Sequence, residues 1–284
     1  MTYRVYITVS RSQGEKDVSL SHSRPTETTM AAKPTLVLVH GAWHRPEHFS
    51  PLVNILHDLH GYNCVTVSLP SMEYTPETGH KGLAEDTSAI RNTILAELST
   101  NPSTDVVLVA HSYGGIPAMN SLQDLDKFAR SKAGHQNCVS AAALICAFVL
   151  TIGPTLLDIV NASSLTAPIF DLVGNGCNIP NNPKHNFYHE LPQAESEHWI
   201  SLLRPQSLVA NVSPVTCEGF REVPTSYLVC TEDRAIPIDA QRAMLEALKP
   251  TELRTEEIAS AHSPFLSVPE RAAEFVRRSA GEKI

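Results

Sequence analysis

Short apolar runs, many of them β-branched, alternate with segments of helical periodicity from residue 35 onward. Several runs are apolar at every position, which is typical of strands buried on both faces, as in a parallel sheet. Parallel strands need long connections, and the helical segments lie between the runs. We therefore expect an α/β fold with a mostly parallel, twisted sheet and helices on both faces. The strand candidates are 36–39, 64–69, 106–110, 141–150, 226–230 and 254–258.

The helical segments follow these strand candidates in order. The clearest one, 82–99, has an apolar face with residues at helical spacing: Leu83, Ile90, Ile94 and Leu98. Length and periodicity indicate one folded domain. The other helices are expected over 46–60, 114–128, 238–248 and 268–278.

The stretch 151–222 interrupts the alternation. It contains clusters of Gly, Asn and Pro and short amphipathic pieces but no strong buried strand, so we expect a small helical insertion, a lid over the sheet. The sheet core then comprises 34–150 and 223–284. Residues 1–33 are largely polar and rich in Ser and Thr, and we expect a partly ordered N-terminal extension. The aromatic residues of the lid either line a pocket or pack the lid onto the core: Phe170, Phe187, Tyr188 and Trp199.

The composition excludes several classes of protein. With 284 residues, of which 42% are hydrophobic and 18% charged, the chain can bury a large core. Its 22 basic residues are scattered and its net charge is -8, so no nucleic-acid partner is expected. No apolar run reaches the roughly 20 residues that span a membrane, so we expect a soluble, cytoplasmic protein with no membrane partner. The six cysteines have no C-x-x-C spacing and are expected to be free thiols.

Residues that carry chemistry follow directly after the strand candidate 106–110. The sequence His111-Ser112-Tyr113-Gly114-Gly115 leads from this strand into a helix. A serine on a tight strand-to-helix turn needs small residues two positions away on either side, because the backbones crowd there. Ala110 and Gly114 meet this need, and the turn would expose the Ser112 Oγ. We therefore expect Ser112 to act as a nucleophile.

A serine hydroxyl near neutral pH needs a base to remove its proton. His262 follows the last strand candidate in a loop, from which it can reach the turn. The base in turn needs a carboxylate that holds its tautomer, and Glu232 and Asp233 both follow the run 226–230. Spacing leaves both acids open. The pattern predicts a set of nucleophile, base and acid in the order Ser, acid, His along the chain.

The first strand candidate is followed by His40-Gly41-Ala42-Trp43. Gly41 permits this loop to approach the serine turn closely. Two backbone N–H groups, those of Ala42 and Tyr113, would then hold the negative oxygen that forms when the nucleophile attacks a carbonyl carbon. We expect these two residues to form an oxyanion hole.

From about residue 34 to the C-terminus the chain resembles an α/β-hydrolase. Its motifs resemble those of the small-lid serine esterases, a branch that includes plant methyl-ester esterases and hydroxynitrile lyases. The resemblance implies Ser112 as nucleophile, His262 as base and Asp233, rather than Glu232, as acid. It also implies that a small, largely apolar carboxylic ester or lactone is cleaved through an acyl-enzyme, without a cofactor. We expect a small-molecule substrate in contact with lid and loop aromatics: Trp43, Phe187 and Trp199.

Two positions depart from the lyases of this branch. The lyases carry Thr where Gly41 stands and Lys directly after the catalytic His, where this chain has Ser263. Cyanohydrin cleavage is therefore disfavoured, and Ser112 argues against epoxide and haloalkane hydrolases, which place Asp at the turn. Two alternatives stay open, a lyase or cyclase of a biosynthetic pathway that uses the same site and a ligand receptor on the same fold. The oligomeric state is open as well.

One further motif, His44-Arg45-Pro46-Glu47-His48, fits the H-x-x-E-H pattern of zinc peptidases. Zinc binding by this motif requires both His on one face of a formed helix. Pro46 is best placed at the first helical position, which leaves His44 outside the helix. We therefore expect no metal site.

Overall fold

The computed structural model describes residues 32–162, 169–248 and 253–284. The extension expected over 1–33 lies outside these ranges, apart from its last two residues. Residues 33–284 form one compact unit. No helix of the described ranges is long and apolar enough to cross a membrane. All six cysteines are described and free, which confirms that prediction.

The central sheet has six parallel strands in the order β2-β1-β3-β4-β8-β9. The middle strands β1 and β3 are buried at every residue, which explains their unbroken apolar sequences. The expected fold class is therefore confirmed. The strands are β1 (Thr35–Val39), β2 (Cys64–Val67), β3 (Val106–His111), β4 (Val139–Ile145), β8 (Thr225–Cys230) and β9 (Arg254–Ile258).

Strand β4 ends earlier than the predicted 141–150. Cys146 has a left-handed backbone with φ of 33°, so the chain leaves the sheet there. Two residues later, the N–H of Phe148 donates to the carbonyl oxygen of Ser112 at 2.9 Å. The apolar residues after Ile145 are thus a connection that passes beside the serine turn, and burial rather than sheet pairing explains their composition.

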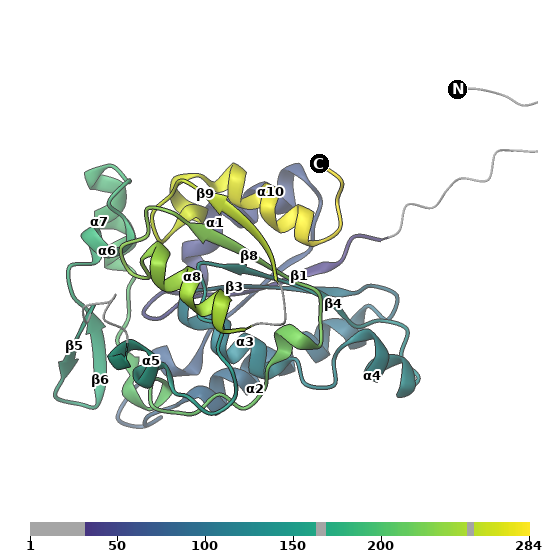
Figure 1. The fold of residues 1–284 in the computed structure, drawn as a ribbon, viewed down its shortest axis with the longest axis horizontal. Coiled ribbons are helices and arrows are strands. Elements are labelled where there is room, and N and C mark those ends of the chain that lie inside the picture. Colours follow the sequence, from purple (N-terminus) through teal and green to yellow (C-terminus); the bar gives the residue numbers. More distant parts are fainter. Residues whose placement is uncertain (1–31, 163–168, 249–252) are drawn as a thin grey trace, which may run out of the picture. The chain divides into compact units, whose positions relative to one another are not determined.

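Helices cover both faces of the sheet, with α1 and α10 on one face and α2 and α3 on the other (Figure 1). The helix expected over 46–60 consists of three short pieces, η1 (Pro46–Phe49), α1 (Ser50–Asn54) and η2 (Ile55–Leu59). The remaining helices of the core are η3 (Pro70–Met72), α2 (Leu83–Thr100), η4 (Ser112–Gly114), α3 (Gly115–Ser121), α4 (Lys127–Lys132), α8 (Ile238–Ala247), α9 (Pro264–Ser267) and α10 (Pro269–Ser279).

The single helix expected over 114–128 is wrong, because α3 and α4 are separate. Asp124 adopts φ of 60° between them, and this conformation ends a helix. Asp126 then caps α4 by accepting hydrogen bonds from the backbone N–H groups of Phe128 and Ala129 at 2.7 and 3.2 Å.

The insertion 151–222 contains helices as expected, together with a three-stranded antiparallel sheet, β5-β6-β7, that the sequence did not indicate. Strand β6 is missed because its two buried residues, Cys177 and Asn178, do not form an apolar run. Figure 1 shows β5, β6, α6 and α7 grouped together. The elements are α5 (Leu156–Ala162), β5 (Phe170–Val173), β6 (Cys177–Pro180), α6 (Pro183–Phe187), α7 (Gln193–Ser201), β7 (Gln206–Ser207), η5 (Leu208–Ala210) and η6 (Gly219–Arg221).

Candidate active site

Ser112 lies on a sharp turn between β3 and α3. Its φ of 53° is in the left-handed region, which non-glycine residues seldom adopt and which persists where surrounding structure enforces it. The neighbouring glycines are required by space. A Cβ on Gly114 would lie 2.4 Å from the carbonyl oxygen of His40, and one on Gly41 would lie 2.8 Å from the Ser112 Cβ. The small residues of the motif therefore let two loops close around the serine.

Ser112, His262 and Asp233 lie in one hydrogen-bonded row. The Ser112 Oγ is 3.0 Å from His262 Nε2, and His262 Nδ1 is 2.8 Å from Asp233 Oδ2. All three side chains are buried. Glu232, the other acid that spacing left open, is exposed. The loops after three different strands thus bring residues 112, 233 and 262 together.

The Asp233 carboxylate is held by the loop that follows it. Its Oδ1 accepts the backbone N–H groups of Ala235 and Ile236 at 2.8 and 2.9 Å, which leaves Oδ2 for His262. Gln241 on α8 fastens the same loop, because its Nε2 donates to the carbonyl oxygens of Cys230 and Ile236 at 3.0 and 2.8 Å. Sequence reasoning missed Gln241, a polar residue that is fully buried.

His111 supports the loop of His262. Its Nε2 donates to the backbone carbonyl oxygen of His262 at 2.9 Å, and the two rings lie 4.6 Å apart. Complete burial lowers the pKa of His111 well below its ordinary value, and the nearby charge of a protonated His262 lowers it further. His111 is therefore a neutral ring, and its hydrogen bond holds the loop of His262 in place.

Two further buried histidines hold the loop of Gly41 and Ala42. His40 Nδ1 donates to the Gly41 carbonyl at 2.9 Å, while its Nε2 accepts the N–H of Leu69 at 3.2 Å. His44 Nδ1 donates to the Ala42 carbonyl at 2.7 Å, and its Nε2 accepts the hydroxyl of Tyr188 at 2.9 Å. Burial lowers the pKa of His40 to about 4 and that of His44 well below its ordinary value, so both rings stay neutral.

Tyr113 is fixed by a buried carboxylate on α2. Its hydroxyl donates to Asp86 Oδ2 at 2.7 Å, and Asp86 also accepts the N–H and hydroxyl of Ser71 at 2.8 and 2.6 Å. Burial raises the pKa of Asp86. The side chain of Tyr113 is thereby anchored beside the backbone that follows Ser112. Asp86 could have been found from the sequence, since it shares the buried face of α2 with Leu83 and Ile90.

A cavity of about 50 Å³, called here the catalytic cavity, lies at Ser112. Two of its walls are the predicted oxyanion-hole residues, Ala42 and Tyr113, and Trp43 also lines it. Its remaining wall is mostly apolar and comes from the chain after β4, the insertion and the loop after Asp233: Phe148, Leu156, Leu157, Val160, Ile169, Phe170, Asn211, Ala235 and Ile236.

Two of the three aromatic residues expected to contact substrate do not line this cavity. The ring of Phe187 stacks on Trp43, with centroids 5.7 Å apart, and is almost fully buried behind it. Trp199 packs on the ring of His48 at 5.6 Å instead. Both residues join the insertion to the core. Phe170, considered in the sequence as either pocket or packing, does line the cavity.

A chain of amides connects the insertion to the cavity wall. Trp43 Nε1 donates to Asn178 Oδ1 at 2.8 Å, and Asn178 Nδ2 donates to Asn211 Oδ1 at 3.2 Å. Both asparagines are buried. Strand β6 thus holds Trp43, whose φ of 61° is itself left-handed, in its position at the cavity.

The H-x-x-E-H motif lies in different surroundings from a zinc site. Its two histidine rings are 4.7 Å apart, but His48 accepts the N–H of Arg45 at 3.1 Å and donates to the carbonyl oxygen of Trp199 at 3.1 Å. His44 is likewise occupied on both nitrogens. Glu47 pairs with Arg45 at 3.1 Å. These hydrogen bonds give the motif a structural role, which is to connect η1 to the insertion.

His111, Cys146 and His262 bring potential metal-binding atoms within 4.8 Å of one another. Burial raises the pKa of Cys146 well above its ordinary value, so the group is a protonated thiol. Its S–H donates to the His262 carbonyl oxygen at 3.3 Å. Since both ring nitrogens of His262 already bond Ser112 and Asp233, the cluster packs beneath the row of residues 112, 262 and 233.

Most of the chain is similar to known proteins. Residues 36–277 match the profile of the "Alpha/beta hydrolase family". The chain is 30% identical over 256 residues to "Alpha/beta hydrolase nvfD" of Aspergillus novofumigatus, which covers 89% of this chain and 98% of that relative. It is 24% identical over 266 residues to "Methylesterase 1" of Arabidopsis thaliana. This alignment covers 87% of this chain and 96% of that relative.

Solved structures share the fold. A crystal structure of the pyrethroid hydrolase PytH superimposes with a TM-score of 0.68 at 21% identity and covers 87% of this chain and 97% of that one. A mutant of polyneuridine aldehyde esterase also gives a TM-score of 0.68, at 19% identity. The superposition covers 87% of this chain and 99% of that one. At these identities the likeness establishes the fold alone.

Proposed function

Because this chain belongs to the alpha/beta hydrolase family, we propose that it is a serine hydrolase that cleaves a largely apolar carboxylic ester or lactone through an acyl-enzyme. The observation that carries this proposal is the row from Ser112 Oγ through His262 to Asp233, with contacts of 3.0 and 2.8 Å. The names of relatives such as the Arabidopsis methylesterase support an ester as substrate. The catalytic cavity has a volume of about 50 Å³, which suits a small group of the ester next to the carbonyl that reacts.

In the first half-reaction, His262 Nε2 accepts the proton of Ser112 as Oγ attacks the carbonyl carbon. Asp233 stabilises the imidazolium that forms, and its own orientation is maintained by the N–H groups of Ala235 and Ile236. When the tetrahedral intermediate collapses, the proton on Nε2 passes to the departing alkoxide. The alcohol leaves, and an ester of Ser112 remains.

The negative oxygen of the intermediate is assigned to the backbone N–H groups of Ala42 and Tyr113. Both residues line the cavity next to Ser112, which supports this assignment. Two buried side chains hold them, since His44 bonds the Ala42 carbonyl and Asp86 bonds the Tyr113 hydroxyl. Donors that are fixed before the reaction stabilise the developing charge without a cost of reorganisation.

In the second half-reaction, a water molecule gives its proton to His262 and attacks the acyl carbon. The bond to Ser112 Oγ breaks, and the proton returns to the serine. The products are a carboxylic acid and the alcohol, or one hydroxy acid from a lactone. Hydrolysis therefore places one oxygen of solvent water in the acid, whereas a lyase or cyclase at the same site would incorporate none.

The test is the rate of p-nitrophenyl acetate hydrolysis by variants of the row. We expect Ser112→Ala and Asp233→Asn each to lower kcat/KM by about 10⁴-fold. Glu232→Gln is the matched control, because it neutralises the exposed neighbour of Asp233, and it should leave the rate within about threefold. A Ser112→Ala variant that retains the rate would show that the proposal is wrong.

A further inference from the structure

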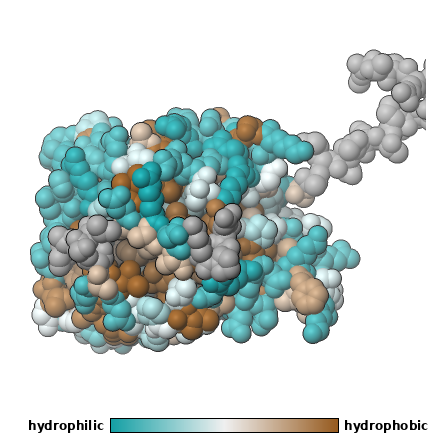
Figure 2. All heavy atoms as spheres, in the orientation of Figure 1, coloured by the Kyte–Doolittle hydropathy of each residue, from teal (hydrophilic) through white to brown (hydrophobic). Residues whose placement is uncertain are grey.

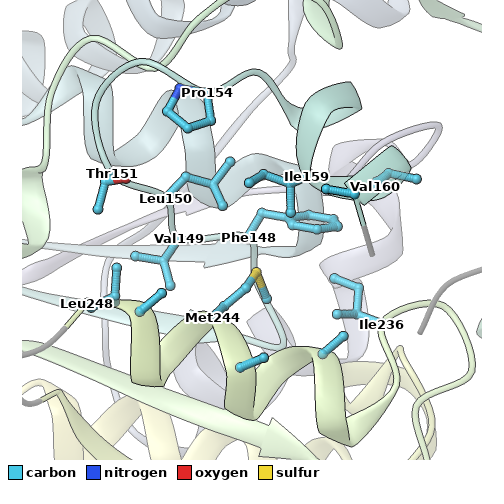
Figure 3. A pocket seen from close by; sticks show the side chains of 14 residues that line it. Phe148, Val149, Leu150, Thr151, Pro154, Ile159, Val160, Ile236, Met244 and Leu248 are labelled. Carbon is cyan, nitrogen blue, oxygen red and sulfur yellow. The ribbon is translucent and has the colours of Figure 1, made fainter. Parts of the chain in front are cut away.

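A second cavity adjoins the catalytic cavity and is called here the side cavity. Its volume is about 400 Å³, whereas that of the catalytic cavity is about 50 Å³. It lies between α5, α8 and the segment 148–151 that follows β4 (Figure 3). Pockets that hold small organic ligands in proteins measure about 300–1,000 Å³, so this one has the size of a ligand site.

The described residues that line the side cavity present almost entirely hydrocarbon to it. Figure 3 shows Phe148, Ile159 and Val160 on one side and Met244 of α8 on the other. Hydrophobic residues also gather on the face of the molecule that carries α5 and α8 (Figure 2). Among the described residues of the wall, none has a charged side chain. A charged or strongly hydrogen-bonding ligand would lose its hydration there without compensation, whereas a hydrocarbon would gain from burial.

Three residues line both cavities: Phe148, Val160 and Ile236. Two of them are attached to the proposed catalytic residues through their backbones. The N–H of Phe148 donates to the Ser112 carbonyl oxygen at 2.9 Å, and that of Ile236 donates to Asp233 Oδ1 at 2.9 Å. The two cavities therefore adjoin at these three side chains, close to the reacting serine.

We propose that the side cavity binds a bulky, uncharged hydrocarbon group of the ester while the ester carbonyl lies at Ser112. This inference rests on the proposed function and widens its substrate class, from the small ester expected from the sequence to an ester with one small and one large apolar part. The small part occupies the catalytic cavity. Binding energy from the large part then positions the carbonyl for attack.

The test fills the side cavity from a position where a larger side chain is tolerated. Ala243 on α8 lines the cavity and is exposed, so Ala243→Phe adds a ring to its mouth without disturbing the core. Ala84 on α2 is also exposed and lines neither cavity, so Ala84→Phe is the matched control. Each variant is assayed with two substrate pairs. The acyl pair is p-nitrophenyl acetate and p-nitrophenyl adamantanecarboxylate, and the alcohol pair is methyl and adamantyl acetate.

We expect Ala243→Phe to lower kcat/KM at least tenfold for the bulky member of one pair and to leave the small member of that pair within twofold. Ala84→Phe should change neither. The inference is overturned if Ala243→Phe affects small and bulky esters equally, if it affects none, or if the wild-type protein turns over p-nitrophenyl acetate but neither bulky ester. If the proposed function itself were wrong, the Ser112→Ala variant would still hydrolyse p-nitrophenyl acetate.

Discussion

Ser112 owes its position to two residues that have no side chain. Gly41 and Gly114 allow the loop after β1 and the turn after β3 to touch, and the contact distances of a hypothetical Cβ, 2.8 and 2.4 Å, are shorter than real Cβ atoms tolerate. The left-handed φ of the serine adds strain that the surrounding core must support. The site is thus sensitive to the addition of single methyl groups.

Gly41→Ala should damage both activity and stability. The new Cβ would press on the Ser112 Cβ at 2.8 Å and on His111 Nδ1 at 2.9 Å, so the nucleophile must move relative to its base. We expect kcat/KM for p-nitrophenyl acetate to fall about 100-fold and the free energy of unfolding to fall by about 1–3 kcal/mol. Gly174→Ala is the control, because nothing lies within 4 Å of its Cβ position. A Gly41→Ala enzyme with the wild-type rate would refute this account of the turn.

Much of the site could be predicted from the sequence because each residue follows a strand. The positions of Ser112 and His262 came from this rule, but the choice between Glu232 and Asp233 did not, since adjacent residues share the same strand exit. The structure separates the two by burial. Gln241 and His111 have no motif that marks their supporting roles. Asp86 did have a signal, a carboxylate on the apolar face of a helix.

At the scale of elements, apolar runs gave reliable strands where both faces are buried, as in β1 and β3. They failed where a buried segment is not a strand and where a strand buries polar residues. The run after Ile145 is buried but is no strand, and β6 is a strand whose buried residues include the polar Asn178. The division of the chain into core and insertion, with a lid function for the latter, stays a prediction.

The insertion is connected to the active site through Asn178 of β6, and this connection can be tested. Asn178→Leu removes the acceptor of the Trp43 indole N–H and the donor to Asn211. Because an unpaired buried donor costs about 1–3 kcal/mol, we expect the urea midpoint to fall accordingly. KM should rise more than kcat falls, since Trp43 and Asn211 line the cavity but take no part in proton transfer.

Asn54→Leu serves as the comparison, because Asn54 is an exposed asparagine on α1. It should leave both the urea midpoint and KM near the wild-type values. If Asn178→Leu behaved in the same way as this control, the amide chain would have no role in holding the cavity wall.

For the molecule as a whole, buried histidines contribute to the way stability depends on pH. Burial lowers the pKa of His40 and of His48 from 6.5 to about 4, and it lowers those of His44 and His111 as well. Below pH 6.5 the unfolded chain takes up protons that the folded protein does not bind until about pH 4. The free energy of unfolding should therefore fall as the pH drops through this window, and these groups should not affect it above pH 6.5.

His48→Gln tests this linkage. Each such histidine contributes at most about 1.4 kcal/mol per pH unit to the slope of unfolding free energy against pH. Urea titrations between pH 6.5 and pH 4.5 should show a slope that is smaller by up to this amount in His48→Gln. His135→Gln, which replaces an exposed histidine, should keep the wild-type slope. An unchanged slope in His48→Gln would contradict the assignment of a neutral, buried ring.

The central claim is that Ser112 is a nucleophile activated by His262, and covalent labelling tests it most directly. A fluorophosphonate probe reacts with serines that are activated in this way. We expect mass spectrometry of the digested protein to find the label on Ser112, no label in Ser112→Ala, and labelling slowed at least 100-fold in His262→Gln. An unlabelled wild-type protein, or a label that persists in Ser112→Ala, would contradict the claim.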